Sequence, residues 1–221
     1  MKFRYIVLVY MIVFCLALVI GLYAKTSYID LNNKKEPLNG FTIGLLPDDL
    51  TEIEVVQMKE NLDKSNLILA VECKEKPNFQ YSCALQNVEV KKVFKGKDIK
   101  VGNNIELCTV TSVFTNKDMY VGGKPTLNID FVNKMEVGRR YLVFLDKKVE
   151  NSNIYIGLDD IFVKTVFCYD EIKNKPCKHI DKNKTSAYYK DVSDNEFFIN
   201  SQKGLDKIEK YKKSLIKKYA Y

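Results

Sequence analysis

The sequence contains no tryptophan and a single histidine, His179, in 221 residues. Any Ser-His-Asp or Cys-His catalytic arrangement would have to use that histidine. Its neighbours in KPCKHIDKNK indicate an exposed basic loop, whereas a general base needs a positioned partner. We therefore interpret His179 as a residue that faces solvent.

Other features of catalytic sites are also missing. The sequence has no Cys-x-x-Cys pair to accompany its one histidine, which disfavours a zinc site. It lacks both glycine patterns that bind phosphate, G-x-x-x-x-G-K-[ST] and G-x-G-x-x-G. Asp159 and Asp160 are adjacent, so in a strand their carboxylates would point to opposite faces. We predict that the protein is not an enzyme and has no catalytic residue, cofactor or metal.

Charge is absent from one long stretch, Tyr5 to Ala24. At a rise of 1.5 Å per residue, about 20 residues cross a hydrocarbon core of roughly 30 Å. A secretory signal has a shorter apolar region followed by small residues, whereas Leu22 and Tyr23 make a poor cleavage site. We predict an uncleaved transmembrane signal anchor over residues 1–24; a cleaved signal peptide, giving a secreted protein, is the alternative.

The charges that flank this stretch predict its orientation. Lys2 and Arg4 precede it, while Lys25 and the pair Lys34-Lys35 follow it. The near flank favours an N-terminus inside the cell and a body outside. We predict a single-pass cell-membrane protein with an extracytoplasmic body, joined to the anchor by a tether over residues 25–47.

The body begins with a helix and continues with strands. Asp48 or Asp49 is a candidate N-cap for a helix over residues 48–64. Alternating and fully apolar runs between turn signals then indicate an all-β barrel or sandwich. The predicted strands cover residues 67–76, 81–94, 104–114, 126–132, 139–148, 153–157 and 161–167.

Two of these strands carry further detail. In 81–94, Val88 and Val90 share a face and Val93 has the opposite parity, which predicts a β-bulge at Lys91-Lys92. Gly96 permits a corner after it, and a long bent strand suits a small coiled barrel. In 139–148, Tyr141, Val143 and Leu145 face one way and Leu142 and Phe144 the other. We expect that strand to be covered on both faces.

The order of four segments resembles a known family. They are the strand near 67–72 and then VEVKKVFKG, GNNIEL and VGRRYLVFL. This order resembles the netrin-like, tissue-inhibitor-of-metalloproteinase-like variant of the OB fold found in bacterial envelope proteins. The resemblance implies a mainly β body with flanking helices: a five-stranded Greek-key barrel over residues 65–167, outside the cytoplasm. An immunoglobulin-like sandwich is the alternative. Protease inhibition is not implied, because no residue here matches the mature N-terminal cysteine that reaches the protease zinc.

Five cysteines follow the anchor. If the first hairpin turns at Pro77 to Phe79, Cys73 and Cys83 lie opposite one another, close enough for a disulfide. Cys168 and Cys177 would close a small loop, and Cys108 would remain unpaired. The alternative is that all five are buried thiols.

Residues 168–221 are predicted to form a loop segment followed by a basic amphipathic helix. Asn200 or Ser201 is the candidate cap, and Leu205, Ile208, Tyr211, Leu215 and Tyr219 form the apolar stripe. The basic surface candidates are Lys207, Lys210, Lys213 and Lys217. They could contact anionic lipid or wall polymer, or they could be the solvated face of a helix packed on the barrel.

These observations predict a non-catalytic, membrane-tethered domain that binds a protein partner at the cell envelope. The candidate contact is the loop 116–125, in which Met119, Tyr120 and Val121 are apolar and followed by glycine. The alternative is that these three residues are packed under the barrel. The alternative functions are peptidase inhibition and binding of an anionic surface. We expect no nucleic-acid partner, because an anchored external domain rarely meets single strands.

Overall fold

The computed structural model describes residues 2–27, 30–80, 83–110, 112–114, 123–128, 131–157, 165–180 and 185–221. The chain forms two compact units, Met1–Lys35 and Glu36–Tyr221. The first unit contains helix α1 (Lys2–Ser27), and its large apolar side chains are exposed. Among the described residues, the Phe3–Tyr23 part of α1 is the one segment long and apolar enough to cross a membrane. This fits the predicted anchor.

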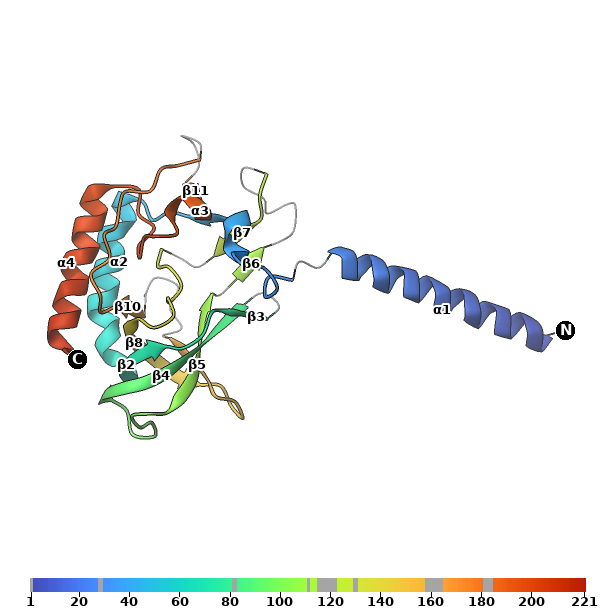
Figure 1. Ribbon diagram of the computed structural model, residues 1–221, viewed down its shortest axis with the longest axis horizontal. Coiled ribbons are helices and arrows are strands. Elements are labelled where there is room, and N and C mark those ends of the chain that lie inside the picture. Colours follow the sequence, from blue (N-terminus) through green and yellow to red (C-terminus); the bar gives the residue numbers. More distant parts are fainter. Residues whose placement is uncertain are drawn as a thin grey trace. The chain divides into compact units, whose positions relative to one another are not determined.

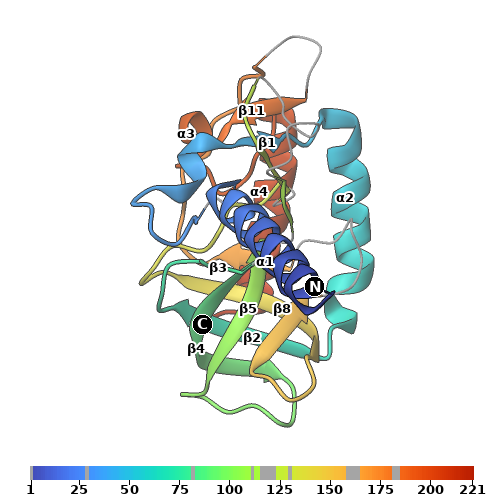
Figure 2. The same ribbon diagram turned by 90° about the vertical axis from the view of Figure 1, so that its right-hand side faces the viewer.

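The strands of the second unit form two sheets (Figure 1). The larger has seven strands in the order β10-β8-β2-β4-β5-β9, with β3 on β4. The smaller has the order β11-β1-β7-β6, and its strands β11 and β1 lie at the other end of the unit from β2, β4 and β5 (Figure 2). The larger sheet contains β2 (Leu67–Cys73), β3 (Asn78–Gln80), β4 (Cys83–Lys95), β5 (Asn104–Val110), β8 (Arg140–Lys148), β9 (Ile154–Gly157) and β10 (Val166–Cys168). The smaller contains β1 (Thr42–Gly44), β6 (Ser112–Phe114), β7 (Thr126–Asn128) and β11 (Ser186–Tyr188).

Strand β9 pairs with two strands, β5 and β8, that are separated from each other in the order of the larger sheet. β9 pairs in parallel with β5 and antiparallel with β8. β8 in turn pairs antiparallel with β2. The body therefore consists mostly of sheet, with parallel and antiparallel pairs and flanking helices. The predicted mainly β body with flanking helices is confirmed in this general form.

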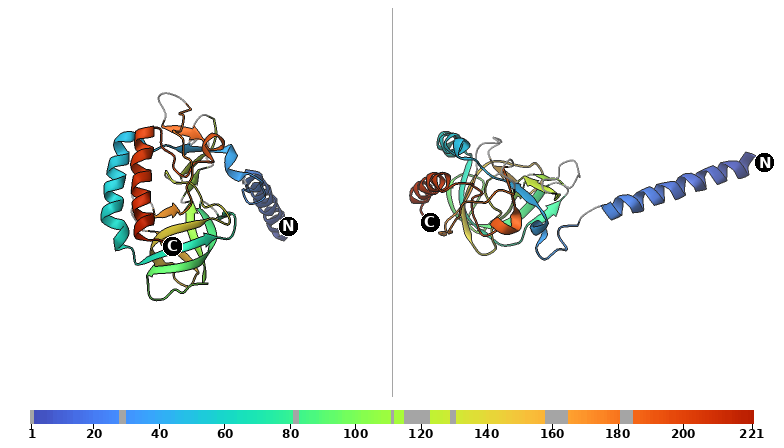
Figure 3. Two further views of the ribbon diagram at one scale, coloured as in Figure 1. Left: turned by 60° about the vertical axis from the view of Figure 1, so that its left-hand side comes forward. Right: turned by 90° about the horizontal axis from the view of Figure 1, so that it is seen from above.

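Two long helices, α2 (Asp48–Asn61) and α4 (Gln202–Lys218), lie side by side (Figure 3). Near their starts Lys207 pairs with Glu52 at 2.8 Å, and near their ends Lys218 pairs with Asp63. The helices therefore run parallel. The short elements are the 3₁₀ turns Pro37–Gly40 and Leu62–Lys64 and helix α3 (Tyr189–Val192).

The predicted caps were right for one helix only. Ser201 caps α4 by accepting a hydrogen bond from the Gly204 N–H at 3.0 Å. Helix α2 starts at Asp48 after Pro47 and has no side-chain cap. Asp48 instead accepts a hydrogen bond from the Ser201 hydroxyl, so its carboxylate joins the two helix starts.

Each face of β8 and β2 belongs to a separate core, as predicted for β8. Leu142 and Phe144 pack with Ile68 in a cluster completed by side chains of α2 and α4, among them Met58, Leu62, Leu205, Ile208 and Leu215. Tyr141, Val143 and Leu145 pack on the other face with residues of β2, β4, β5 and β9. The helices cover one face of the sheet, and the sheet's own strands enclose the other.

Strand β4 bends at two bulges, one of which was predicted. Ala70 pairs with Lys92 and Val71 with Val90, which leaves Lys91 as an extra residue. A second register shift at Ile68/Leu69 makes Phe94 the other extra residue. The corner after β4 uses Gly96 at a φ of 131°, a conformation that L side chains rarely adopt.

The ends of the predicted elements differ from the structure in two places. The range 25–47 predicted as a tether includes β1, whose Ile43 is fully buried between β11 and β7. Asn78, predicted to lie in a turn with Pro77, is the first residue of β3, which pairs with the start of β4. Both elements have three residues, too few to show an alternation of apolar and polar side chains.

Candidate functional site

A pocket of about 520 Å³ lies between the chain that follows β10 and the second half of α4. Its lining is mixed, with apolar side chains beside acids and lysines. The residues are Tyr169, Asp170, Glu171, Ile172 and Asn174 from the first segment and Glu209, Lys212, Lys213, Ile216 and Lys217 from α4. The volume lies within the range of about 300–1,000 Å³ that small-ligand pockets have in proteins, but the lining is more highly charged than is usual for them.

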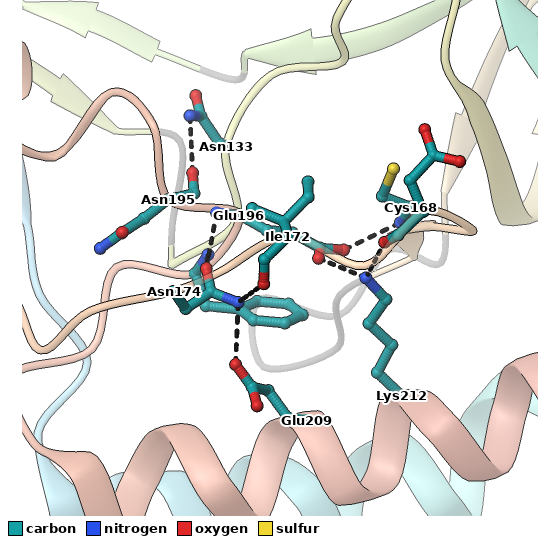
Figure 4. A network of polar contacts seen from close by, with 10 residues as sticks. Asn133, Cys168, Ile172, Asn174, Asn195, Glu196, Glu209 and Lys212 are labelled. Carbon is teal, nitrogen blue, oxygen red and sulfur yellow. Dashed lines mark hydrogen bonds and ion pairs between the residues drawn. The ribbon is translucent and has the colours of Figure 1, made fainter.

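A buried ion pair holds the two walls of the pocket together (Figure 4). Lys212 Nζ lies 2.5 Å from Glu196 Oε2, and the two side chains are 10% and 4% exposed. The same ammonium donates to the Asp170 carbonyl at 3.0 Å, and Glu196 Oε1 accepts from the Cys168 N–H at 2.8 Å. These bonds fix α4 against the end of β10.

Burial raises the pKa of Glu196 above the ordinary value of 4.5. The ammonium of Lys212 and the Cys168 N–H act in the opposite direction, because both favour the carboxylate, but they offset only part of the desolvation. The carboxylate of Glu196 therefore depends on Lys212 to remain charged in this environment.

Asn174 positions the other side of the pocket. Its Nδ2 donates to Glu209 Oε1 at 3.0 Å, and its Oδ1 accepts from the N–H groups of Glu196 at 2.7 Å and Phe197 at 3.1 Å. Figure 4 shows Asn174 between the chain of Glu196 and helix α4. One amide thus connects three segments around the pocket.

The mouth of the pocket carries exposed lysines. Lys213 and Lys217 lie one helical turn apart on α4 and are exposed. Neither forms an ion pair with a described residue. Both ammonium groups are therefore available to a ligand, beside the exposed carboxylates of Asp170 and Glu171.

Of the four predicted basic candidates, the structure thus places two at the pocket. Lys210 is exposed on α4 outside it, and Lys207 is half-buried and bound to Glu52. The predicted contact residues Met119, Tyr120 and Val121 lie outside the described residues.

The predicted disulfides are not formed: none of the six cysteines is in a disulfide bond. Cys73 pairs across the sheet with Val88, and Cys83 pairs with Gln80. The predicted register was wrong because the start of β4 pairs with β3, and the end of β2 pairs further along β4. Val88 lies five positions after Cys83, which is roughly 17 Å at 3.3 Å per residue.

Cys168 and Cys177 each have their own partners. The Cys168 thiol interacts with the Arg139 side chain, while Cys177 Sγ lies 3.2 Å from Asn195 Nδ2. Both thiols are buried, and burial raises the pKa of each. The alternative reading of buried thiols therefore describes Cys73, Cys168 and Cys177.

His179 is exposed, and its Nε2 lies 3.3 Å from Asn200 Nδ2. Among the described residues there is no group of three His, Cys, Asp or Glu side chains that could hold a metal ion.

The sequence carried one signal for the pocket that the prediction missed. Lys212 lies four residues after Ile208 and three before Leu215, within the apolar stripe of α4. A lysine at such a position requires a buried acidic partner. Nothing in the sequence identifies that partner as Glu196, which the chain brings to α4 from the loop before it.

Comparison with protein-family models and with curated proteins gives no match to the chain.

Proposed function

We propose that this chain is a membrane-tethered, extracytoplasmic domain that binds a protein partner through the pocket beside α4. The pocket carries the proposal, because its walls are fixed by Lys212, Glu196 and Asn174 while its mouth is lined by exposed groups. A concavity of about 520 Å³ accommodates one or two side chains of a partner. The apolar helix α1 would tether the body that carries this pocket to the membrane.

We further propose that the body is the OB-like barrel implied by the netrin-like resemblance. The pairings that support it run from β2 to β4, β5, β9, β8 and back to β2. All are antiparallel except β5 with β9. A sandwich of the immunoglobulin type is built from antiparallel sheets, so the parallel pair favours the barrel. The apolar cluster containing Val71, Val90 and Val143 would be its interior.

The experiment is site-specific photo-crosslinking from the full chain in membranes of the cells that make it. A photoreactive side chain at Ile216, in the pocket, should give one discrete protein adduct. The same probe at Asp206, which is exposed on α4 outside the pocket, should not give it. Lys213→Trp fills the mouth from an exposed position and should abolish the adduct, whereas Asp206→Trp should leave it. Equal adducts from both positions, or an adduct indifferent to Lys213→Trp, would refute the pocket as the binding site.

Binding to an anionic surface is the second candidate. Lys210, Lys213 and Lys217 are spaced by three and four residues, so they form one exposed strip on α4. That strip would attract acidic lipid or polymer in a salt-dependent way. If it is the site, the full chain in neutral nanodiscs should capture acidic vesicles at low salt, and reversal of the three charges should abolish capture. A protein adduct lost on Lys213→Trp without vesicle capture would favour the first candidate.

A further inference from the structure

Cys83 and Cys108 are neighbours on adjacent strands, although the sequence had suggested other pairs. Cys83 is the first residue of β4, and Cys108 lies near the end of β5. The register places Ala84 opposite Val110 and Leu85 opposite Cys108, so Thr109 is an extra residue in β5. Because side chains alternate between faces, Cys83, Leu85 and Cys108 lie on the same face of the sheet.

The two thiols are diagonal neighbours that interact. On one face of an antiparallel pair, diagonal neighbours have Cα atoms about 7–8 Å apart and Cβ atoms somewhat closer, so a small backbone movement brings such a pair to disulfide geometry. The side chain of Cys83 is a hydrogen-bonding neighbour of the Cys108 thiol. Cys83 Sγ also lies 3.3 Å from the Gln80 carbonyl, which fixes its position at the end of the sheet.

The other buried thiols contact groups that cannot form a disulfide. Cys73 Sγ lies near the Glu75 carbonyl and the Gln86 amide, at 3.3 and 3.4 Å. Cys177 contacts Asn195, and Cys168 contacts Arg139. The contact between Cys83 and Cys108 is between two thiols, and both side chains are only partly buried.

We infer that Cys83 and Cys108 form a disulfide that joins β4 to β5 when the chain meets an oxidising disulfide. The oxidant is a dithiol protein in its disulfide form or a small disulfide. The Cys83 thiolate attacks one oxidant sulfur, forming a mixed disulfide and releasing a thiolate. The Cys108 thiolate then attacks the Cys83 sulfur, closing the bond and releasing the second thiolate. Two thiols are oxidised, one disulfide is reduced to two thiols, and the protons of Cys83 and Cys108 pass to the leaving thiolates.

The pKa of the Cys108 thiol determines how the rate of the second step, its attack on the Cys83 sulfur, depends on pH. Burial and the neighbouring Cys83 raise the pKa of the Cys108 thiol to about 11. Its thiolate is therefore scarce at neutral pH, and ring closure should accelerate as the pH rises. The inference is independent of the proposed partner and of the membrane orientation, because both thiols belong to one sheet.

The test is disulfide mapping of the purified, fully reduced chain in detergent after incubation with oxidised glutathione. Trypsin separates the two sites: peptide 75–91 contains only Cys83, and peptide 101–117 contains only Cys108. We expect these two peptides to be joined by a bond that reductant breaks. In denaturant, the number of free thiols should fall from six to four. The thermal midpoint should rise by roughly 5–10 °C, because the bond closes a loop of about 25 residues.

Cys83→Ser and Cys108→Ser should each abolish the joined peptide and the rise in the midpoint, whereas Cys15→Ser should retain both. Cys83→Ala and Cys108→Ala, checked by circular dichroism, replace any serine variant that fails to fold. The mapping of the unaltered chain decides the question without any variant. A different cysteine pair, a glutathione adduct on Cys83 with Cys108 still free, or six free thiols after oxidation would overturn the inference.

Discussion

Lys212 and Glu196 are buried charges that depend on each other. Removing one partner of such a pair leaves the other charged and desolvated, which destabilises proteins by about 3–5 kcal/mol. The pair is also the contact by which α4 holds the chain after β10. A single side chain thus affects both stability and the shape of the pocket.

We predict that Glu196→Gln lowers the free energy of unfolding by about 3 kcal/mol in urea denaturation, since Lys212 loses its counter-charge. Glu209→Gln is the matched control. Glu209 lies on the pocket wall and accepts a hydrogen bond from the Asn174 amide. Glu209→Gln should therefore lower the free energy of unfolding by less than about 1 kcal/mol. The double variant Glu196→Leu/Lys212→Met should recover most of the loss. Equal midpoints for Glu196→Gln and the unaltered chain would contradict the structure.

Asp63 gives the molecule a pH-dependent contact between the 3₁₀ turn after α2 and the end of α4. Lys218 and the Tyr219 hydroxyl, which lies 2.6 Å from Asp63 Oδ1, hold the pKa of this carboxyl below its ordinary value of 3.8. A depressed carboxyl pKa stabilises the folded state above the unfolded pKa, and this contribution is lost as the pH falls through the folded pKa.

Asp63→Asn should therefore lower the thermal midpoint at pH 6, by the equivalent of less than about 1 kcal/mol because the pair is half exposed. The difference from the unaltered chain should disappear between about pH 4 and pH 2. The measurement is the thermal midpoint of both proteins as a function of pH. A difference that stayed constant down to pH 2 would mean that the ionised carboxylate is not the cause.

At the scale of elements, the close approach of the starts of α2 and α4 requires Gly204. A Cβ atom at this position would lie 2.7 Å from Ile199 Cγ2 and 3.0 Å from Asp48 Oδ1. Contacts this short force the surrounding groups to move. With any other residue at this position, Ile199 or the start of α2 would have to shift.

Gly204→Ala should destabilise the protein by about 1–3 kcal/mol in chemical denaturation, although alanine is the better helix former by about 1 kcal/mol. Lys203→Ala, at the adjacent exposed position, should change stability by less than about 0.5 kcal/mol. A stabilising Gly204→Ala would show that helix propensity outweighs the clash.

The elements differ in how far the sequence predicted them. The faces of β8, the corner at Gly96 and the cap at Ser201 follow from residues within a few positions of each other, and all three predictions are confirmed. The register of Cys73 and Cys83 depended on β3, a three-residue strand without a periodic pattern. The pocket depends on Glu196 and Lys212 meeting through the tertiary fold, so only the position of Lys212 on the apolar stripe could have signalled it.

At the scale of the whole molecule, the orientation of the body remains a prediction from the charges around α1. Lys2 and Arg4 precede the apolar run and favour an external body. A cysteine introduced at Lys100, which is exposed in the turn between β4 and β5, reports on it directly. In a Cys15→Ser background, Lys100→Cys should react with a membrane-impermeant maleimide on intact cells.

The parent Cys15→Ser chain, treated in parallel, measures any reaction of the native thiols. The same label applied after lysis gives the total accessible amount. Labelling of Lys100→Cys only after lysis would place the body in the cytoplasm. The proposed partner would then have to be sought there.

The core beneath α4 has a consequence for the synthesis of the protein. Leu205, Ile208 and Leu215 fill the same cluster as Phe144 of β8, yet they are translated about 60 residues or more after it. Helix α2 is made earlier and contributes Met58 to that cluster, but until α4 emerges from the ribosome or the export channel, the part of the sheet face that α4 covers is apolar and exposed. The nascent chain therefore passes through a stage in which it exposes a surface for chaperones, and release of the last helix ends that stage.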